Sequence, residues 1–181
     1  FVTITNPSVE YGTLLPGNSS VTEDFSLVLS ESVINNENLK LRLTITDNDE
    51  NEWNGIVSIE VEAPHLIIFD VNIESGSIHP GESKDISIVL SNRGSVSSGD
   101  ISAILSSGFY VLSVVDGIGA WDTIFPGYTS ESNDSFTIYA SDDIINGTVL
   151  TLNLKIETAN GYNRTENISV QIGEVSESDP L

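Results

Sequence analysis

Residues 25–45 read FSLVLSESVINNENLKLRLTI, and the same pattern returns at 136–156 as FTIYASDDIINGTVLTLNLKI. A shorter stretch ahead of each copy repeats as well, because YGTLLPG at 11–17 matches WDTIFPG at 121–127. Asp24 aligns with Asp134, an offset of 110, and one inserted position then raises the offset to 111, which aligns Phe25 with Phe136. Since apolar positions, turn residues and register agree together, the sequence predicts one folding unit that has been duplicated.

The second copy is predicted to be complete and the first to lack its front. The complete copy begins near residue 66, whereas the offset of 110 places Phe1 opposite Val111. Residues 66–110 therefore have no counterpart ahead of Phe1, and the chain is expected to begin inside a domain. The predicted organisation is a partial domain at 1–62, a linker at 63–65, a complete domain at 66–173 and an acidic tail or linker at 174–181.

Both copies are predicted to be all-β. Short runs alternate apolar with polar residues, which is the pattern of strands with one buried face, and no helical period is sustained. The turn-rich stretches between them suit an antiparallel sandwich better than a parallel sheet with crossover helices. The predicted strands are 39–45, 55–61, 84–90, 100–105, 151–156 and 167–172.

Pro-Gly pairs punctuate the chain three times, each two residues after an apolar side chain. Proline sets φ for the second position of a turn and glycine accepts a positive φ at the third, so each pair is expected to end one strand and start the next. The pairs are Pro16-Gly17, Pro80-Gly81 and Pro126-Gly127, preceded by Leu14, Ile78 and Ile124.

The composition is strongly acidic, with 27 acidic and 6 basic residues and a formal net charge of −21. Nucleic acids and anionic membranes attract clustered Lys and Arg, so this balance argues against both as partners. The apolar fraction of 39% is typical of a folded domain with an acidic surface. Cysteine is absent, which excludes disulfides, a thiol nucleophile and a thiolate metal site. No apolar run is long enough to span a membrane, and Phe1 does not open a signal sequence. If the intact protein is secreted, its signal is expected upstream of Phe1.

Two consecutive stretches carry a resemblance to a known family. They are LKLRLTITDNDENEWNGIVSIEVEAP at 39–64 and PHLIIFDVNIESGSIHPGESKDISIVLSNRGSVSSGDISAILSS at 64–107. They resemble the tandem Ig-like modules, similar to CARDB-type domains, that follow the catalytic domain in secreted microbial peptidases of the gingipain and subtilisin types. The specific points are Pro-Gly-Glu at 80–82, Ser-Asn-Arg-Gly at 91–94 and the acidic turn 47–51 before Trp53. The resemblance implies tandem Ig-like sandwiches that display, space or stabilise an enzyme or attach to a surface, and no catalytic residue carries over.

The alternation of Asp47, Asp49 and Asn51 resembles the start of a calcium loop, because close carboxylates on one loop supply several of the oxygens that Ca²⁺ needs. However, Glu52 stands where an EF-hand needs glycine, and Ser58 stands where it needs a bidentate glutamate. The matching positions of the second copy are Thr158, Asn160 and Tyr162. A solvated hairpin turn is the favoured interpretation, with Ca²⁺ as the alternative cofactor.

Catalysis is not predicted. His65 and His79 stand beside prolines in an expected linker and turn, the sequence near them suggests no triad or metal centre, and G-x-S-x-G is absent. Among the aromatic residues, Trp121 matches Tyr11 across the repeat, and the match predicts a packed position that both copies require. Trp53 matches Arg164 and is left without a structural explanation. Trp53 is therefore the candidate for carbohydrate binding.

Five N-x-S/T sequons are candidate glycosylation sites, and all are expected in or beside turns. They are Asn18, Asn133, Asn146, Asn163 and Asn167.

The predicted function is that of a non-catalytic accessory or adhesion module of an exported microbial protein. It would serve spacing, attachment or protein contact at the cell surface, with a neighbouring domain, an identical subunit or a surface polysaccharide as partner. Two alternatives remain open. One is a subunit of an extracellular filament built by β-strand donation, and the other is a carbohydrate-binding module.

Overall fold

The computed structural model describes residues 2–20, 24–30 and 35–174, and these residues form strands and turns without any helix. The chain divides into two units, Phe1–Val33 and Ile34–Leu181. The division falls inside the stretch that the sequence assigned to one partial sandwich. Most of the expected tail lies outside the described residues. Within the described part, no helix capable of crossing a membrane is present.

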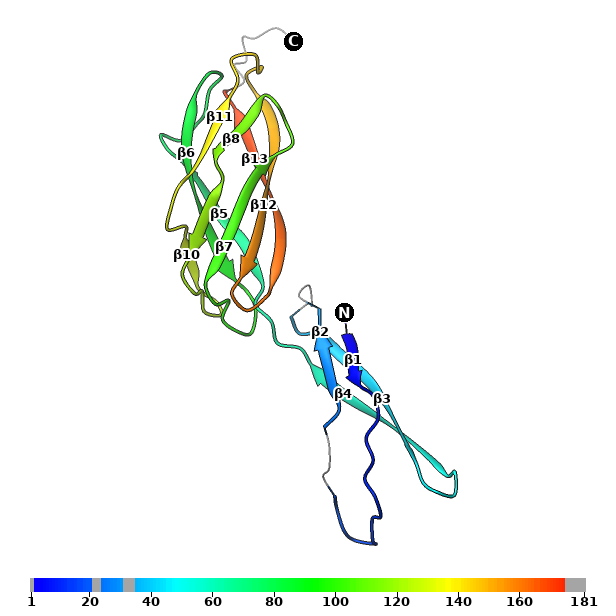
Figure 1. Ribbon diagram of the computed structural model, residues 1–181. Helices are drawn as coiled ribbons and strands as arrows, with labels where there is room; N and C mark the ends of the chain where they lie inside the picture. Colours follow the sequence, from blue (N-terminus) through cyan, green and yellow to red (C-terminus); the bar gives the residue numbers. More distant parts are fainter. Residues whose placement is uncertain (1, 21–23, 31–34, 175–181) are drawn as a thin grey trace. The chain divides into compact units, whose positions relative to one another are not determined.

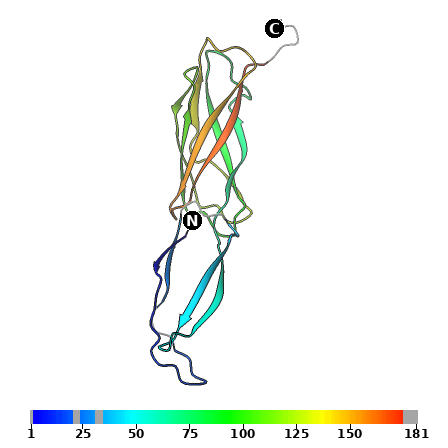
Figure 2. The ribbon, with the colours of Figure 1, turned by 90° about the vertical axis from the view of Figure 1, so that its right-hand side faces the viewer.

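Among the described residues of the second unit, nine strands form two antiparallel sheets (Figures 1 and 2). In the first sheet, β6 pairs along one edge with β5 and along the other with β11 and β10, and β8 pairs with β11. The second sheet has the order β13-β12-β7-β9. The strands of the first sheet are β5 (Leu66–Ile73), β6 (Ser83–Asn92), β8 (Leu112–Asp116), β10 (Thr129–Glu131) and β11 (Phe136–Ala140). Those of the second are β7 (Ile101–Ser107), β9 (Ile118–Trp121), β12 (Thr148–Thr158) and β13 (Asn163–Ile172).

The two sheets enclose one hydrophobic core, as in a β-sandwich. Alternate residues of the long strands point inward, so the period-two pattern of the sequence becomes a buried face on each sheet. Both sheets contribute fully buried side chains, including Ile86, Ile88 and Leu90 from β6 and Leu152, Leu154 and Ile156 from β12. The all-β fold predicted from the alternation is confirmed.

A buried asparagine ties together the loops at one end of this sandwich. Asn92 accepts hydrogen bonds at Oδ1 from the backbone N–H groups of His65 and Gly94, at 3.1 and 2.9 Å. Its Nδ2 donates to the backbone oxygens of Val96 and Ile124, at 2.8 and 2.9 Å. Because every polar atom of the side chain has a partner, complete burial of this amide is tolerated.

The second unit also contains a hairpin formed by β3 (Asn38–Thr46) and β4 (Glu52–Glu60). The segment after β4, predicted as a linker, is packed: Ala63 and Pro64 are buried. The Ala63 N–H donates to Asn35 Oδ1 at 2.9 Å, and the Ala63 oxygen accepts the Ser95 N–H at 3.2 Å. A Cβ on Gly94 would come within 2.3 Å of that same oxygen, so glycine is required for this close approach.

The first unit contains one antiparallel pair among its described residues, β1 (Val2–Asn6) with β2 (Ser26–Leu29). The ladder shifts register between Ile4 and Asn6, as at a β-bulge. Apolar side chains of this pair are exposed, among them Ile4 and Val28.

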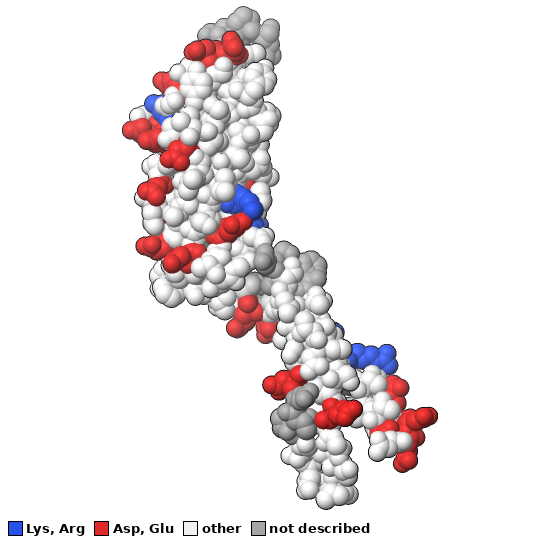
Figure 3. All heavy atoms as spheres, in the orientation of Figure 1, with Lys and Arg blue, Asp and Glu red and all other residues white. Residues whose placement is uncertain are grey.

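The three Pro-Gly turns have the predicted geometry. Gly17, Gly81 and Gly127 have φ values of 79°, 82° and 82°. The turns at Gly81 and Gly127 lead directly into β6 and β10, whereas no described strand begins immediately after Gly17. Acidic side chains are scattered over the visible face, with few basic ones between them (Figure 3).

Candidate interaction surface

The β3–β4 hairpin is amphipathic. Residues directly opposite each other in an antiparallel pair project from the same face, and alternate pairs share that face. The apolar face of the hairpin consists of the pairs Leu39–Ile59, Leu41–Val57, Leu43–Gly55 and Ile45–Trp53.

The opposite face carries a polar network centred on Asn54. Its Oδ1 accepts hydrogen bonds from Arg42 Nε at 3.1 Å and Thr44 Oγ1 at 2.9 Å, and its Nδ2 donates to Glu52 Oε1 at 2.7 Å. The polar face is therefore suited to water, while the apolar face has the composition of a core layer.

Exposure on the apolar face rises from the base of the hairpin towards its tip, with Leu41 and Leu43 half-buried in between. Leu39 is 8% exposed, whereas Val57, Ile45 and Trp53 are 45, 53 and 54% exposed. A two-stranded hairpin with a partly exposed hydrophobic face is marginal in water, and exposed apolar surface of this kind is typical of interaction sites.

The hairpin repeats the strand pairing of β12 and β13 position by position. Leu41 lies opposite Val57, and at an offset of 111 Leu152 lies opposite Ile168. All nine hairpin pairs have a counterpart at this offset, from Asn38–Glu60 to Thr46–Glu52. Each hairpin turn also has a positive φ at the matching position, at Glu50 and Gly161.

The pair in the first unit repeats the pairing of β8 and β11. Adding 110 to β1 positions and 111 to β2 positions converts Val2–Leu29 into Leu112–Ala140, and the other pairs convert in the same way. The shifts in register also coincide. The β1–β2 ladder shifts between Ile4 and Asn6, and the β8–β11 ladder shifts between the matching residues Val114 and Asp116.

Within the two ladders that both copies share, the pairing is the same but the burial of matching positions differs. Ile45 is 53% exposed and its counterpart Ile156 is fully buried. Phe25 is 46% exposed, whereas its counterpart Phe136 is fully buried. Ile45 and Phe25 are thus exposed at positions that belong to the core in the second copy, while Leu41 and Leu43 are half-buried.

The acidic turn 47–51 is closed by its own side chains. Asp47 Oδ1 accepts the backbone N–H groups of Asp49 and Asn51, both at 2.9 Å, and Oδ2 accepts Asn51 Nδ2 at 2.9 Å. The side-chain hydrogen bond from Asn51, followed by the backbone bond from the same residue, lowers the pKa of Asp47. Its carboxylate therefore acts as a turn cap. Calcium binding here stays a prediction that calorimetry on an Asp47→Asn variant would test.

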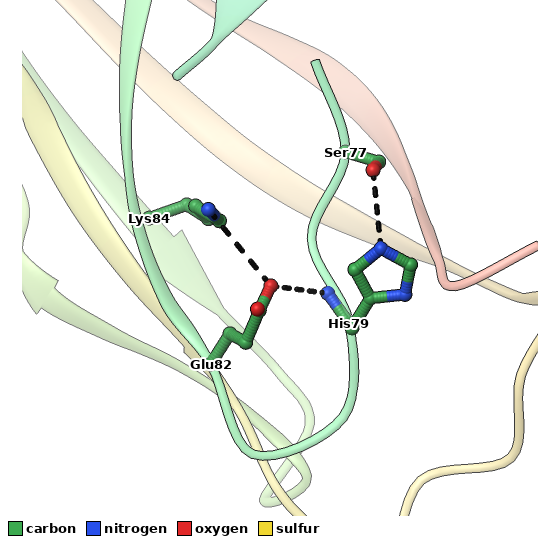
Figure 4. Close-up of polar contacts among 4 residues, drawn as sticks. All are labelled: Ser77, His79, Glu82 and Lys84. Carbon is green, nitrogen blue, oxygen red and sulfur yellow. Dashed lines mark hydrogen bonds and ion pairs between the residues drawn. The ribbon is translucent and has the colours of Figure 1, made fainter. Parts of the chain in front are cut away.

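His79 has a polar neighbour that sequence reasoning missed. Ser77 Oγ lies 3.3 Å from His79 Nε2, and Glu82 Oε2 accepts the His79 backbone N–H at 3.0 Å (Figure 4). Lys84 Nζ lies 3.9 Å from the same carboxylate. A catalytic triad needs the carboxylate on the second ring nitrogen, but here it holds the turn backbone. In the described part of the chain, no three His, Cys, Asp or Glu side chains are grouped to hold a metal.

The sequons occupy different environments. Asn18, Asn133 and Asn146 are exposed in turns or loops. Asn163 begins β13 beside a turn, but Asn167 lies inside β13 opposite Asn153, so its expected placement at a turn is wrong. The Asn167 side chain is nevertheless exposed.

Trp53 has a structural context that the sequence did not show. It extends the row of apolar residues on the hairpin, directly opposite Ile45. Its counterpart Arg164 instead forms an ion pair with Glu166. Recognising this row required the pairing of β3 with β4, which places residues eight apart in sequence side by side.

The chain matches no family model and no curated protein sequence.

Proposed function

We propose that the chain consists of tandem Ig-like modules, the first of them incomplete, and serves as a non-catalytic spacing and attachment element of an extracellular or cell-surface protein. The observation that carries the proposal is the identical strand register of the two copies at the offsets of 110 and 111. Repeated β-modules are a common means of holding a functional domain at a distance from its anchor. The resemblance to modules that follow secreted peptidases favours the same role.

The surface chemistry agrees with contact to proteins. The scattered acids keep the second unit soluble, while the apolar face of the hairpin offers exposed aliphatic residues beside an exposed tryptophan. Assembly through strands, one of the alternatives, is favoured by this face. Carbohydrate binding would use Trp53 as a stacking platform, and it predicts that Trp53→Ala abolishes retention of the full chain on a polysaccharide array.

Single-molecule stretching of the full chain tests the spacing role. A spacer should resist load and then release its folded length in one step, which for residues 66–173 is on the order of 350 Å at full extension. Phe136→Ala should lower the unfolding force because Phe136 is in the core, and Phe25→Ala at the matching exposed position should not. Gradual extension without a discrete step would contradict the proposal.

A further inference from the structure

We propose that the open edge of β3 receives an antiparallel β-strand with the apolar pattern of β7, supplied by polypeptide other than residues 1–181. In the sandwich formed by the second copy, β12 is paired on both sides, with β13 and with β7. Its counterpart β3 is paired with β4 alone among the described strands. An unpaired edge next to exposed apolar side chains is a template for strand addition.

The second copy specifies the register of the incoming strand. Leu152–Thr158 of β12 pair with Ser107–Ile101 of β7. Subtracting 111 assigns the acceptor positions to 41–47. The strand that β12 receives is ISAILSS, in which Ile101, Ala103 and Leu105 are buried. The partner of β3 should therefore be an antiparallel strand with apolar residues at alternate positions.

Charge further defines the partner. Lys40 and Arg42 place two of the chain's six basic residues on β3. The counterpart of Arg42 is Asn153, which lies opposite Ser106 of β7. A neutral or acidic residue at that position of the incoming strand is favoured, because opposite charges directly across a sheet stabilise the pair.

In the first unit, one segment also lacks the β7-like strand with which its counterpart pairs. Residues 8–11 match β9 at the offset of 110, yet they form no strand. In the second copy, β9 pairs with β7 alone among the described strands. The described strands of the first copy are the segments whose pairing partner is also present. Residues 8–11, whose counterpart β9 pairs with β7, do not form a strand.

A folded second copy of this chain is a poor donor of the strand. Its own β7 is paired on both edges, with β12 and β9, and its apolar residues are in the core. Donation would require opening that sandwich. The occupant is thus a separate β-segment with the pattern of residues 66–110. The inference rests on the proposed tandem modules, but its test measures only the hairpin. It can therefore fail while the stretching experiment on the sandwich still gives a single unfolding step.

The backbone amides of β3 provide a specific readout. Asp47 N–H donates across the hairpin to Asn51 at 3.1 Å, as its counterpart Thr158 does to Tyr162 at 2.9 Å. The next residue after β12, Ala159, donates to the opposite side, to Asp100 at 2.9 Å. Because N–H directions alternate along a strand, the amides of Arg42, Thr44 and Thr46 point to the open edge.

The experiment places a second copy of residues 66–110 directly before Phe1 of the full chain and follows amide exchange by NMR. We expect the amides of Arg42, Thr44 and Thr46 to exchange rapidly in residues 1–181 and at least about tenfold more slowly in the extended chain. Trp53 fluorescence should shift to shorter wavelength. An extended chain with Ser in place of the copied Ile101, Ala103 and Leu105 should show neither change.

Matched variants separate strand pairing from general folding. Thr46→Pro removes an outward N–H and should abolish the new protection, whereas Thr46→Ala should keep it. Leu43→Asp on the apolar face should prevent docking, and Ser58→Asp opposite Lys40 on the polar face should not. If the extended chain aggregates, a synthetic peptide of residues 99–108 can be added to residues 1–181 instead, and the exchange of the same three amides is measured.

Two results would overturn the inference. One is unchanged rapid exchange at these amides in a folded extended chain or with saturating peptide. The other is slow exchange already present in residues 1–181, which would mean that a second copy or another part of this chain occupies the edge. Sedimentation of the same sample tells a dimer from a monomer.

Discussion

Trp121 donates its indole N–H to the backbone oxygen of Ile88 at 3.0 Å, and this bond joins β9 of one sheet to β6 of the other. The indole ring also packs against Phe136, with ring centroids 6.1 Å apart. One side chain thus supplies core volume and a polar link between the layers. The expectation of a packed aromatic holds for Trp121 but is wrong for its counterpart Tyr11, which is 41% exposed because the described residues of the first copy form no second layer of this kind around it.

Trp121→Phe should destabilise the chain by about 2–3 kcal/mol through the lost hydrogen bond and a small cavity. The cost is limited because Ile88 O also accepts the Ser132 N–H at 2.9 Å. Urea denaturation followed by circular dichroism measures the change. Trp53→Phe is the matched control, and it should shift stability by less than about 0.5 kcal/mol because the ring is exposed. Equal effects of the two substitutions would contradict this account.

Phe136 and Phe25 occupy matching positions but should respond differently to truncation. Phe136→Ala removes a fully buried ring and is expected to cost about 3–5 kcal/mol. Phe25→Ala should cost less than about 1 kcal/mol in the same denaturation experiment, since its side chain is 46% exposed. Phe25→Ala should cost as much stability as Phe136→Ala only when the missing strands of the first copy are supplied. A large loss of stability from Phe25→Ala in residues 1–181 would mean that Phe25 is already packed in a core.

The sequence predicted the long strands well because each alternates apolar with polar residues. β3, β4, β6, β7, β12 and β13 all overlap the predicted runs. β5 was missed because its alternation is broken by the shift in register between Ile68 and Asp70. The strands β9 and β10 are four and three residues long, which is too short for a periodic pattern to be recognised.

The interaction surface was predictable only in part. The repeat indicated that the first copy lacks strands, and alternation showed that Leu41, Leu43 and Ile45 share a face. The inclusion of Trp53 depended on which residues pair across the turn, and that follows from the hairpin register. The contact of Ser77 with His79 depended on side-chain directions in a loop, for which sequence spacing offers no rule.

Two strand glycines should respond in opposite ways to an added methyl group. A Cβ at Gly119 of β9 would lie 2.2 Å from the Phe136 ring, so Gly119→Ala should destabilise the sandwich by roughly 2 kcal/mol or more. A Cβ at Gly55 of β4 would meet nothing within 4 Å, and Gly55→Ala should be neutral or stabilising by up to about 1 kcal/mol. Thermal unfolding of both variants measures the difference, and the prediction fails if Gly119→Ala is as mild as Gly55→Ala.

Asn92→Ala should be among the most damaging polar substitutions in the chain. It removes four hydrogen bonds and leaves the buried oxygen of Ile124 and the partly buried backbone groups of Gly94 and Val96 without their partner, at a cost of about 3 kcal/mol or more. The exposed Asn72 in β5 is a control, and Asn72→Ala should change the free energy of unfolding by less than about 0.5 kcal/mol. A small effect at Asn92 would mean that water replaces the amide.

The pKa of Asp47 reports the closure of the hairpin turn. The hydrogen bonds from Asn51 to the ionised carboxylate lower this pKa, so the carboxylate stabilises the turn above its ordinary pKa and loses that effect as pH falls through the lowered value. Asn51→Ala should raise the pKa of Asp47 toward the ordinary value, because the side-chain donor is removed while the backbone donors remain. Asn54→Ala, which disrupts the polar face without touching Asp47, should leave it unchanged. Carboxyl ¹³C titration by NMR measures all three proteins, and equal pKa values with and without the Asn51 side chain would show that the backbone alone closes the turn.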